Sequence, residues 1–181
     1  MMKKFLMLLC AAMLFCSCAC AGSGAIDYMD RFEMKGSLPD GYHHTIISMS
    51  DLNLEGDIRP DAEDPAAPWM TVYISFNESY ASVQNLNDLD EGALDLIRQG
   101  FSDENSVAFD MIETASGIRL LVVRETGDDP DFLDFYTVYN GHEIELTLLA
   151  GEGVPDGVLT DAQVENCLKY VRTLEITPMQ G

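Results

Sequence analysis

Apolar and polar residues alternate along several stretches in the middle of the chain. Between residues 69 and 76, Met70, Val72 and Ile74 alternate with polar or aromatic neighbours. A period of two places alternate side chains on opposite faces of a β-strand, so this stretch predicts a strand with one buried face. The same reasoning predicts strands over residues 42–49, 107–113, 118–125, 132–139 and 142–148.

Short turns join the last four of these strands in two pairs. Asn140-Gly141 separates the final pair, and this dipeptide favours the positive φ angles of a type I′ hairpin turn. Ala115-Ser116-Gly117 separates the pair before it. We therefore expect two consecutive hairpins and an antiparallel sheet.

Apolar residues recur at helical spacing in two further segments. Residues 88–101 begin with Asp88 and Glu91, which have the spacing of a capping box. Thr160 and Gln163 have the same spacing at the start of the second segment. The apolar stripe of that second predicted helix consists of Val164, Cys167, Leu168, Val171 and Leu174.

The remaining segments complete the expected order of elements. Residues 25–36 predict a short amphipathic helix, residues 50–68 a long exposed loop, and residues 174–177 a short final strand. We expect an α+β domain in which an antiparallel β-sheet of about six strands is covered on its apolar face by two helices.

The first 21 residues have the three parts of a secretory signal peptide. Lys3 and Lys4 precede an apolar run that is too short to cross a membrane as a helix, and small residues follow it. A lipoprotein signal is the alternative, in which Cys18 or Cys20 carries the lipid. We expect export, with residues 22–37 as a tether or short helix and residues 38–181 as a single α+β domain.

Charge limits the partners that such a domain can bind. The chain has 31 Asp and Glu residues, ten Lys and Arg residues and a net charge of −21. This excess disfavours nucleic acid, whose affinity for proteins comes mainly from Lys and Arg. It also disfavours anionic lipid surfaces, so we expect membrane contact only through a lipid anchor. Removal of the signal would leave Cys167 as the one cysteine, and its place on an apolar stripe predicts a buried thiol.

One acidic segment is a candidate calcium site. Asp51, Asn53, Glu55 and Asp57 alternate like the oxygen ligands of a calcium loop. The twelfth position is Ala62, where such a loop needs a bidentate Glu. A solvated acidic loop is the alternative interpretation, and calcium is the one cofactor that the sequence suggests.

No catalytic residues are predicted. His43 and His44 are adjacent on a predicted strand and therefore point to opposite faces, so they do not easily share one site. His142 follows a turn and is expected at the surface of the sheet. The sequence has neither the nucleophile motif of common hydrolases nor a glycine-rich phosphate loop.

The order of elements behind an export signal resembles that of PsbP-like and DcrB-like domains, which share an α/β/α sandwich. The resemblance covers about residues 38–177 and depends on element order and length. A cystatin-like fold is the alternative, although such folds begin with their helix. The resemblance implies an extracytoplasmic accessory or binding domain without a shared catalytic apparatus.

We therefore expect a non-catalytic domain that contacts another protein of the cell envelope. Two alternatives remain open at this point. One is an enzyme, such as a hydrolase, whose active-site residues are distant in sequence, and the other is a surface protein that binds divalent cations.

Overall fold

The computed structural model describes residues 25–28, 32–50, 52–102, 107–125, 132–154 and 157–178. Its main element is a seven-stranded sheet in which every pair of neighbouring strands is antiparallel. In spatial order the strands are β3 (Tyr42–Met49), β4 (Asn53–Pro60), β5 (Trp69–Phe76), β9 (His142–Leu149), β8 (Phe132–Tyr139), β7 (Arg119–Glu125) and β6 (Val107–Glu113).

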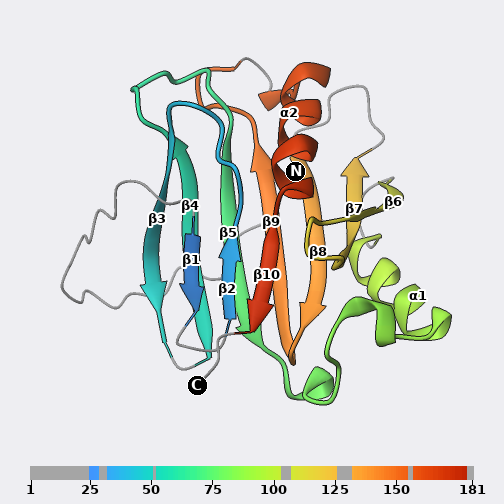
Figure 1. Cartoon of the computed structure of the whole chain (residues 1–181). Helices are drawn as coiled ribbons and strands as arrows, with labels where there is room; N and C mark the ends of the chain where they lie inside the picture. Colours follow the sequence, from blue (N-terminus) through green and yellow to red (C-terminus); the bar gives the residue numbers. More distant parts are fainter. Residues whose placement is uncertain are drawn as a thin grey trace.

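A second, three-stranded sheet joins the two ends of the described chain. It contains β1 (Ala25–Tyr28), β2 (Phe32–Lys35) and β10 (Glu175–Pro178), with β2 in the middle. Figure 1 shows this small sheet in front of the large one, below helix α2 (Asp161–Arg172). The small sheet and α2 therefore form one layer of the protein.

The large sheet separates two apolar cores. Val122 and Val123 are neighbours in β7, yet each belongs to a different cluster of buried side chains. The first cluster includes Val171 of α2, and the second includes Leu94 of helix α1 (Glu91–Phe101). Because adjacent strand residues point to opposite faces, α1 and α2 cover opposite faces of the sheet. The prediction that both helices cover one face is wrong.

The two-sided burial has a visible cause in the sequence of β7 and β8. Residues 120–123 are four consecutive apolar residues, and all of them are buried. Residues 133–139 of β8 are buried as well. Strands of this kind need cover on both faces, whereas β9 alternates between buried and half-buried positions. The α+β class and the antiparallel sheet are confirmed.

Both predicted helices are present, and local side chains fix where they begin. The capping box of α2 between Thr160 and Gln163 is confirmed. Helix α1 begins later than predicted, because the Asp90 side chain accepts a hydrogen bond from the Ala93 amide. Asp88 instead ends a short 3-10 helix, η2 (Leu86–Asp88), which follows another, η1 (Glu78–Tyr80).

The two hairpins are confirmed as well. Asn140 has a φ of 48° and Gly141 a φ of 76°, as a type I′ turn requires. The turn between β6 and β7 contains Gly117 with a φ of 78°. These turns place β6, β7, β8 and β9 side by side in the large sheet.

Two local predictions are wrong. The helix predicted over residues 25–36 is replaced by β1 and β2, and Met34 of β2 is buried in the first core. The long loop predicted over residues 50–68 contains β4, whose acidic residues alternate with Leu54 and Ile58 on the buried face. In both cases the strand is stabilised by partners outside the segment itself.

Candidate binding site

Strand β3 is an edge of the large sheet and lacks the four residue types that are charged at neutral pH. Its sequence, YHHTIISM, contains no Asp, Glu, Lys or Arg. The opposite edge strand, β6, carries Asp110 and Glu113. Edge strands usually carry charges because their unpaired backbone groups can otherwise join the strands of another chain. Strand β3 therefore lacks the usual charged protection against pairing.

Apolar side chains are exposed on this edge. The structure exposes six large apolar or aromatic side chains among the residues it describes, and four of them lie on β3 or just after it. These four define the β3 patch, with Ile46 at 48%, Ile47 at 55%, Met49 at 53% and Leu52 at 56% exposure. Clustered exposed apolar residues are typical of interaction surfaces.

An irregularity in the strand contributes to this exposure. The pairing of β3 with β4 shifts between Ile46 and Ser48, as in a β-bulge. Gly56 of β4 lies opposite, and a Cβ atom there would be 2.8 Å from the Thr45 carbonyl oxygen. In Figure 1 β3 lies outside the area that the small sheet covers. The exposure of the β3 patch therefore follows from the irregular pairing of β3 and from its position at the edge of the sheet.

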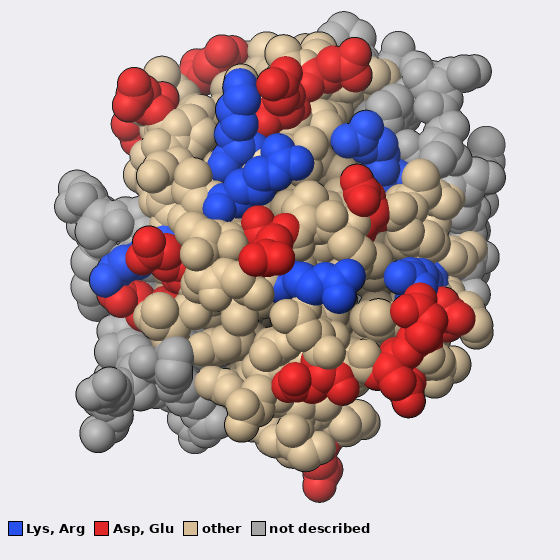
Figure 2. All heavy atoms as spheres, turned by 45° about the vertical axis from the view of Figure 1, so that its right-hand side comes forward, with Lys and Arg blue, Asp and Glu red and all other residues tan. Residues whose placement is uncertain are grey.

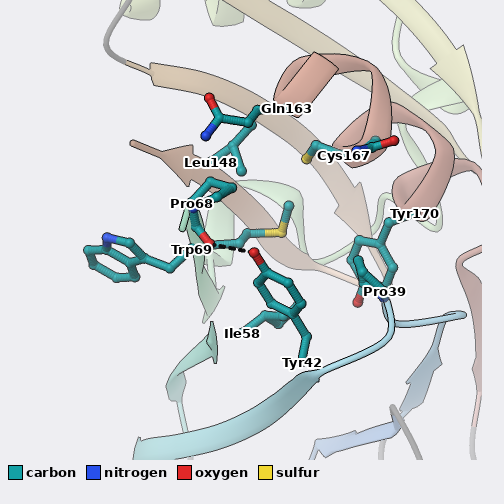
Figure 3. A pocket seen from close by; sticks show the side chains of 11 residues that line it. Pro39, Tyr42, Ile58, Pro68, Trp69, Leu148, Gln163, Cys167 and Tyr170 are labelled. Carbon is teal, nitrogen blue, oxygen red and sulfur yellow. Dashed lines mark hydrogen bonds between the residues drawn. The ribbon is translucent and has the colours of Figure 1, made fainter. Parts of the chain in front are cut away.

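A concave feature lies where α2 meets the large sheet. It is a cavity of about 190 Å³ (Figure 3). Its lining comes from α2, the strands of the large sheet and two prolines: Pro39, Tyr42, Ile58, Pro68, Trp69, Met70, Leu148, Gln163, Asn166, Cys167 and Tyr170. The residues at its floor are buried, whereas Pro39 and Asn166 are exposed, so the cavity opens at their side.

Two aromatic residues at this cavity have defined partners. The Tyr42 hydroxyl donates a hydrogen bond of 3.1 Å to the Pro68 carbonyl oxygen. The Trp69 indole points away from the cavity in Figure 3. Its ring instead lies against the guanidinium of Arg59, at 4.1 Å from the ring centroid.

The cavity floor has a low polarity. Burial raises the pKa of the Cys167 thiol to about 12. Burial also raises the pKa of the Tyr170 hydroxyl, and the nearby Cys167 adds to the effect. Both shifts mean that a charge is poorly solvated at this place. The prediction of a buried Cys167 thiol is confirmed.

A carboxyl group with an altered pKa lies on the other face of the sheet. Glu145 of β9 is opposite Tyr73 on one side and Tyr136 on the other. Burial, then the negative charges of Asp134 and Glu143, raise its pKa to about 7. Glu143 is itself held by the Tyr136 hydroxyl, which donates to its Oε1 at 2.7 Å.

Replacing Glu145 with Gln should remove a pH dependence of stability. The folded protein holds the Glu145 proton more tightly than a carboxyl with the ordinary pKa of 4.5. The resulting stabilisation is complete below that value and is lost as the pH rises through 7. We expect Glu145→Gln to raise the free energy of unfolding at pH 8 by on the order of 2 kcal/mol, measured by urea denaturation.

Glu55→Gln provides the control, because Glu55 is an exposed glutamate of β4 whose strand partner, Tyr73, is also the partner of Glu145. Because Glu55 is exposed, its replacement should change the free energy of unfolding at pH 8 by less than about 0.5 kcal/mol. Equal profiles for the unsubstituted protein and for Glu145→Gln would contradict the assignment.

The predicted calcium ligands do not form a loop. Asp51 lies outside the described residues, and Asn53, Glu55 and Asp57 occupy alternate positions of β4. Asp57 is buried and accepts a hydrogen bond of 2.7 Å from Nε of Arg59. An extended strand does not wrap its side chains around one ion as a calcium loop does. In the part of the chain that the structure describes, no group of three or more metal-binding side chains is arranged to hold an ion.

The three histidines have different surroundings and different contacts. His43 makes a 2.7 Å contact with Asp61, whereas burial and the neighbouring His43 lower the pKa of His44. His142 is buried, so its predicted surface position is wrong. Its ring contacts Phe76 edge to face, with centroids 5.4 Å apart. His142 and Glu145 are three positions apart on one strand, so they lie on opposite faces of the sheet.

Charges of both signs lie on the side of the molecule shown in Figure 2, where Lys and Arg side chains are interspersed among acidic ones. Such mixing also occurs within α1, where Arg98 contacts Glu91 at 2.7 Å and Asp95 at 2.8 Å. This mixture indicates no concentrated positive surface for nucleic acid on that side.

Neither the β3 patch nor the cavity is predicted by the sequence patterns described above. The adjacent isoleucines of β3 in an uncharged stretch were a local signal for the patch, because alternation can bury only one of them. The cavity has no such signal, since its lining comes from segments between Pro39 and Tyr170.

Comparison with known proteins identifies no relative of this chain. No family model, curated protein or solved structure matches the chain significantly. The candidate lipidation sites, Cys18 and Cys20, lie outside the described residues. Within the described ranges, neither helix has the length and apolar character needed to cross a membrane.

Proposed function

We propose that this protein is an exported, non-catalytic binding domain of the cell envelope and that it binds another protein through the β3 patch. The observation that carries the proposal is an edge strand without Asp, Glu, Lys or Arg, on or just after which four apolar side chains are exposed. An exposed sheet edge can accept an extended segment of a partner as an additional strand. Backbone hydrogen bonds would then provide affinity, and Ile46, Ile47 and Met49 would provide apolar contacts.

Export remains part of the proposal and depends on the N-terminal sequence. Residues 1–21 have the composition of a secretory signal, and a lipid on Cys18 or Cys20 would hold the domain at a membrane. We also propose a PsbP-like arrangement of layers, since helices lie on both faces of an antiparallel sheet. A cystatin-like fold is less well supported because five described strands precede the first α-helix.

The arrangement of titratable groups supports binding over catalysis. A histidine next to a carboxyl group of raised pKa would favour an enzyme. The sheet lies between His142 and Glu145, and His43 is on β3, three strands from β9. The described histidines and the Glu145 carboxyl therefore do not form one site.

Cross-linking in the native cells tests this proposal. A photoreactive amino acid at position 47 should give a defined covalent adduct with another protein, identified by mass spectrometry. Position 96 is the matched control, because Leu96 is also an exposed apolar residue but lies on α1. Equal adducts from both positions, or none from position 47, would contradict the proposal.

A charge at the centre of the patch should disrupt the complex. Ile47→Lys places an ammonium group where the proposed partner contacts apolar surface, so we expect binding to weaken about tenfold or more. Leu96→Lys should leave affinity unchanged. Affinity for the cross-linked partner can be measured by titration calorimetry, with circular dichroism as the check that both variants fold.

A further inference from the structure

The cavity under α2 has the size of a site for one small ring. Its volume is about 190 Å³. An apolar cavity of about 150 Å³ in another protein is large enough to bind benzene. A molecule with a single ring and few substituents therefore fits within this volume.

The lining selects against charged ligands. None of its eleven residues is Asp, Glu, Lys or Arg, although acidic residues are abundant in the chain. Burial raises the pKa of Cys167 at the floor, which shows how poorly this place solvates a negative charge. An anion would in addition approach a protein with a net charge of −21. An ammonium group would find no carboxylate partner among the lining residues.

The rim provides a few polar groups that can orient a ligand. The Oε1 atom of Gln163 accepts from the amide and the hydroxyl of Thr160, which leaves its Nε2 group as a donor. The exposed Asn166 adds a second side-chain amide from the same helix. The Tyr42 hydroxyl donates to the Pro68 carbonyl oxygen, and the hydroxyl oxygen can still accept a hydrogen bond. Small-molecule sites commonly combine an apolar body with such convergent polar groups.

We propose that this cavity binds a small, uncharged molecule that has one apolar ring and one hydrogen-bonding substituent. The ring contacts the apolar floor formed by Met70, Leu148 and Cys167, and the substituent faces the amides of Gln163 and Asn166. This site differs from the β3 patch, because none of the four patch residues lines the cavity. The two proposals can therefore fail separately.

Three single-ring probes of similar size test the ligand class. Phenol is uncharged at neutral pH, benzoate is negative and benzylammonium is positive. Binding is measured by ligand-detected nuclear magnetic resonance and by the rise in melting temperature that a ligand specific for the folded state must cause. We expect phenol to bind at millimolar concentration and the two ions to bind at least about tenfold more weakly.

Variants that fill the cavity provide a second test of the proposal. Cys167→Leu and Leu148→Phe each add volume to the floor, and each should weaken phenol binding roughly tenfold. Val164→Leu is the matched control, because Val164 packs on the same core from α2 without lining the cavity. Ile47→Lys should also leave phenol binding unchanged, which separates this site from the β3 patch.

Three results would overturn the proposal: no phenol binding by the unsubstituted protein, equal binding of either ion, or unchanged phenol binding in both filled variants. If one filled variant does not fold, the other decides.

Discussion

Alanine in place of Phe135 is expected to lower the free energy of unfolding by about 3–5 kcal/mol. The Phe135 ring is fully buried in the first core, and its neighbours on the adjacent strands are Val122 and Leu146. Removing the ring loses its apolar contacts and leaves a cavity, because strands paired on both sides cannot close around a smaller residue. Urea denaturation followed by circular dichroism measures the change.

Leu96→Ala is the control for this experiment. Leu96 is 69% exposed on α1, so its replacement should change the free energy of unfolding by less than about 0.5 kcal/mol. A similar small loss for both variants would contradict the assignment of Phe135 to the core.

The second large effect is expected at Gly151. A Cβ atom at this position would lie 2.4 Å from the Pro65 carbonyl oxygen and 2.7 Å from the Ala67 carbonyl oxygen. Both neighbours are backbone atoms, and Gly153 donates a hydrogen bond of 2.7 Å to the same Pro65 oxygen. Gly151→Ala must therefore displace the loop before β5, and we expect it to cost about 2–3 kcal/mol.

A glycine with open surroundings provides a control for which the change in stability should have the opposite sign. Gly100 lies within α1, and a Cβ atom there would meet nothing within 4 Å. Gly100→Ala should stabilise the protein by up to about 1 kcal/mol, because alanine favours the helical backbone. Thermal unfolding of the two variants gives the comparison, and destabilisation by both would show that the surroundings of Gly151 are not the cause.

Elements with strong local signals could be predicted from the sequence. The hairpin at Asn140-Gly141 and helix α2 are examples, since a turn dipeptide and a capping box act within a few residues. The spacing of capping residues predicts too early a start for α1, because Asp88 and Asp90 are both good capping residues. Only the folded chain shows that Asp88 belongs to η2.

Elements that depend on distant partners could not be predicted in the same way. Strand β2 pairs with β1 and β10, so its stability comes partly from a strand at the other end of the domain. Strand β4 contains Glu55, Gly56, Asp57 and Pro60, and acids, glycine and proline are typical of a loop. It forms a strand because it lies between β3 and β5, with Leu54 and Ile58 buried and the buried Asp57 paired with Arg59.

The candidate sites also depend on the assembled fold. The exposure of the β3 patch follows from the position of β3 at an edge that no described strand covers. The cavity is lined by both Tyr42 and Cys167, which are far apart in the sequence. For the same reason, the raised pKa of Glu145 depends first on burial in the assembled sheet and then on the charge of Asp134 from a neighbouring strand. Such relations cannot be deduced from residue spacing.

Hydrogen exchange of the β3 backbone amides, with and without the cross-linked partner, is the most direct test of binding at this edge. Added strand pairing should slow exchange in residues 43–49 while leaving residues 107–113 of the opposite edge unchanged. Slower exchange at β6 alone, or unchanged exchange at β3 in a saturated complex, would contradict the account.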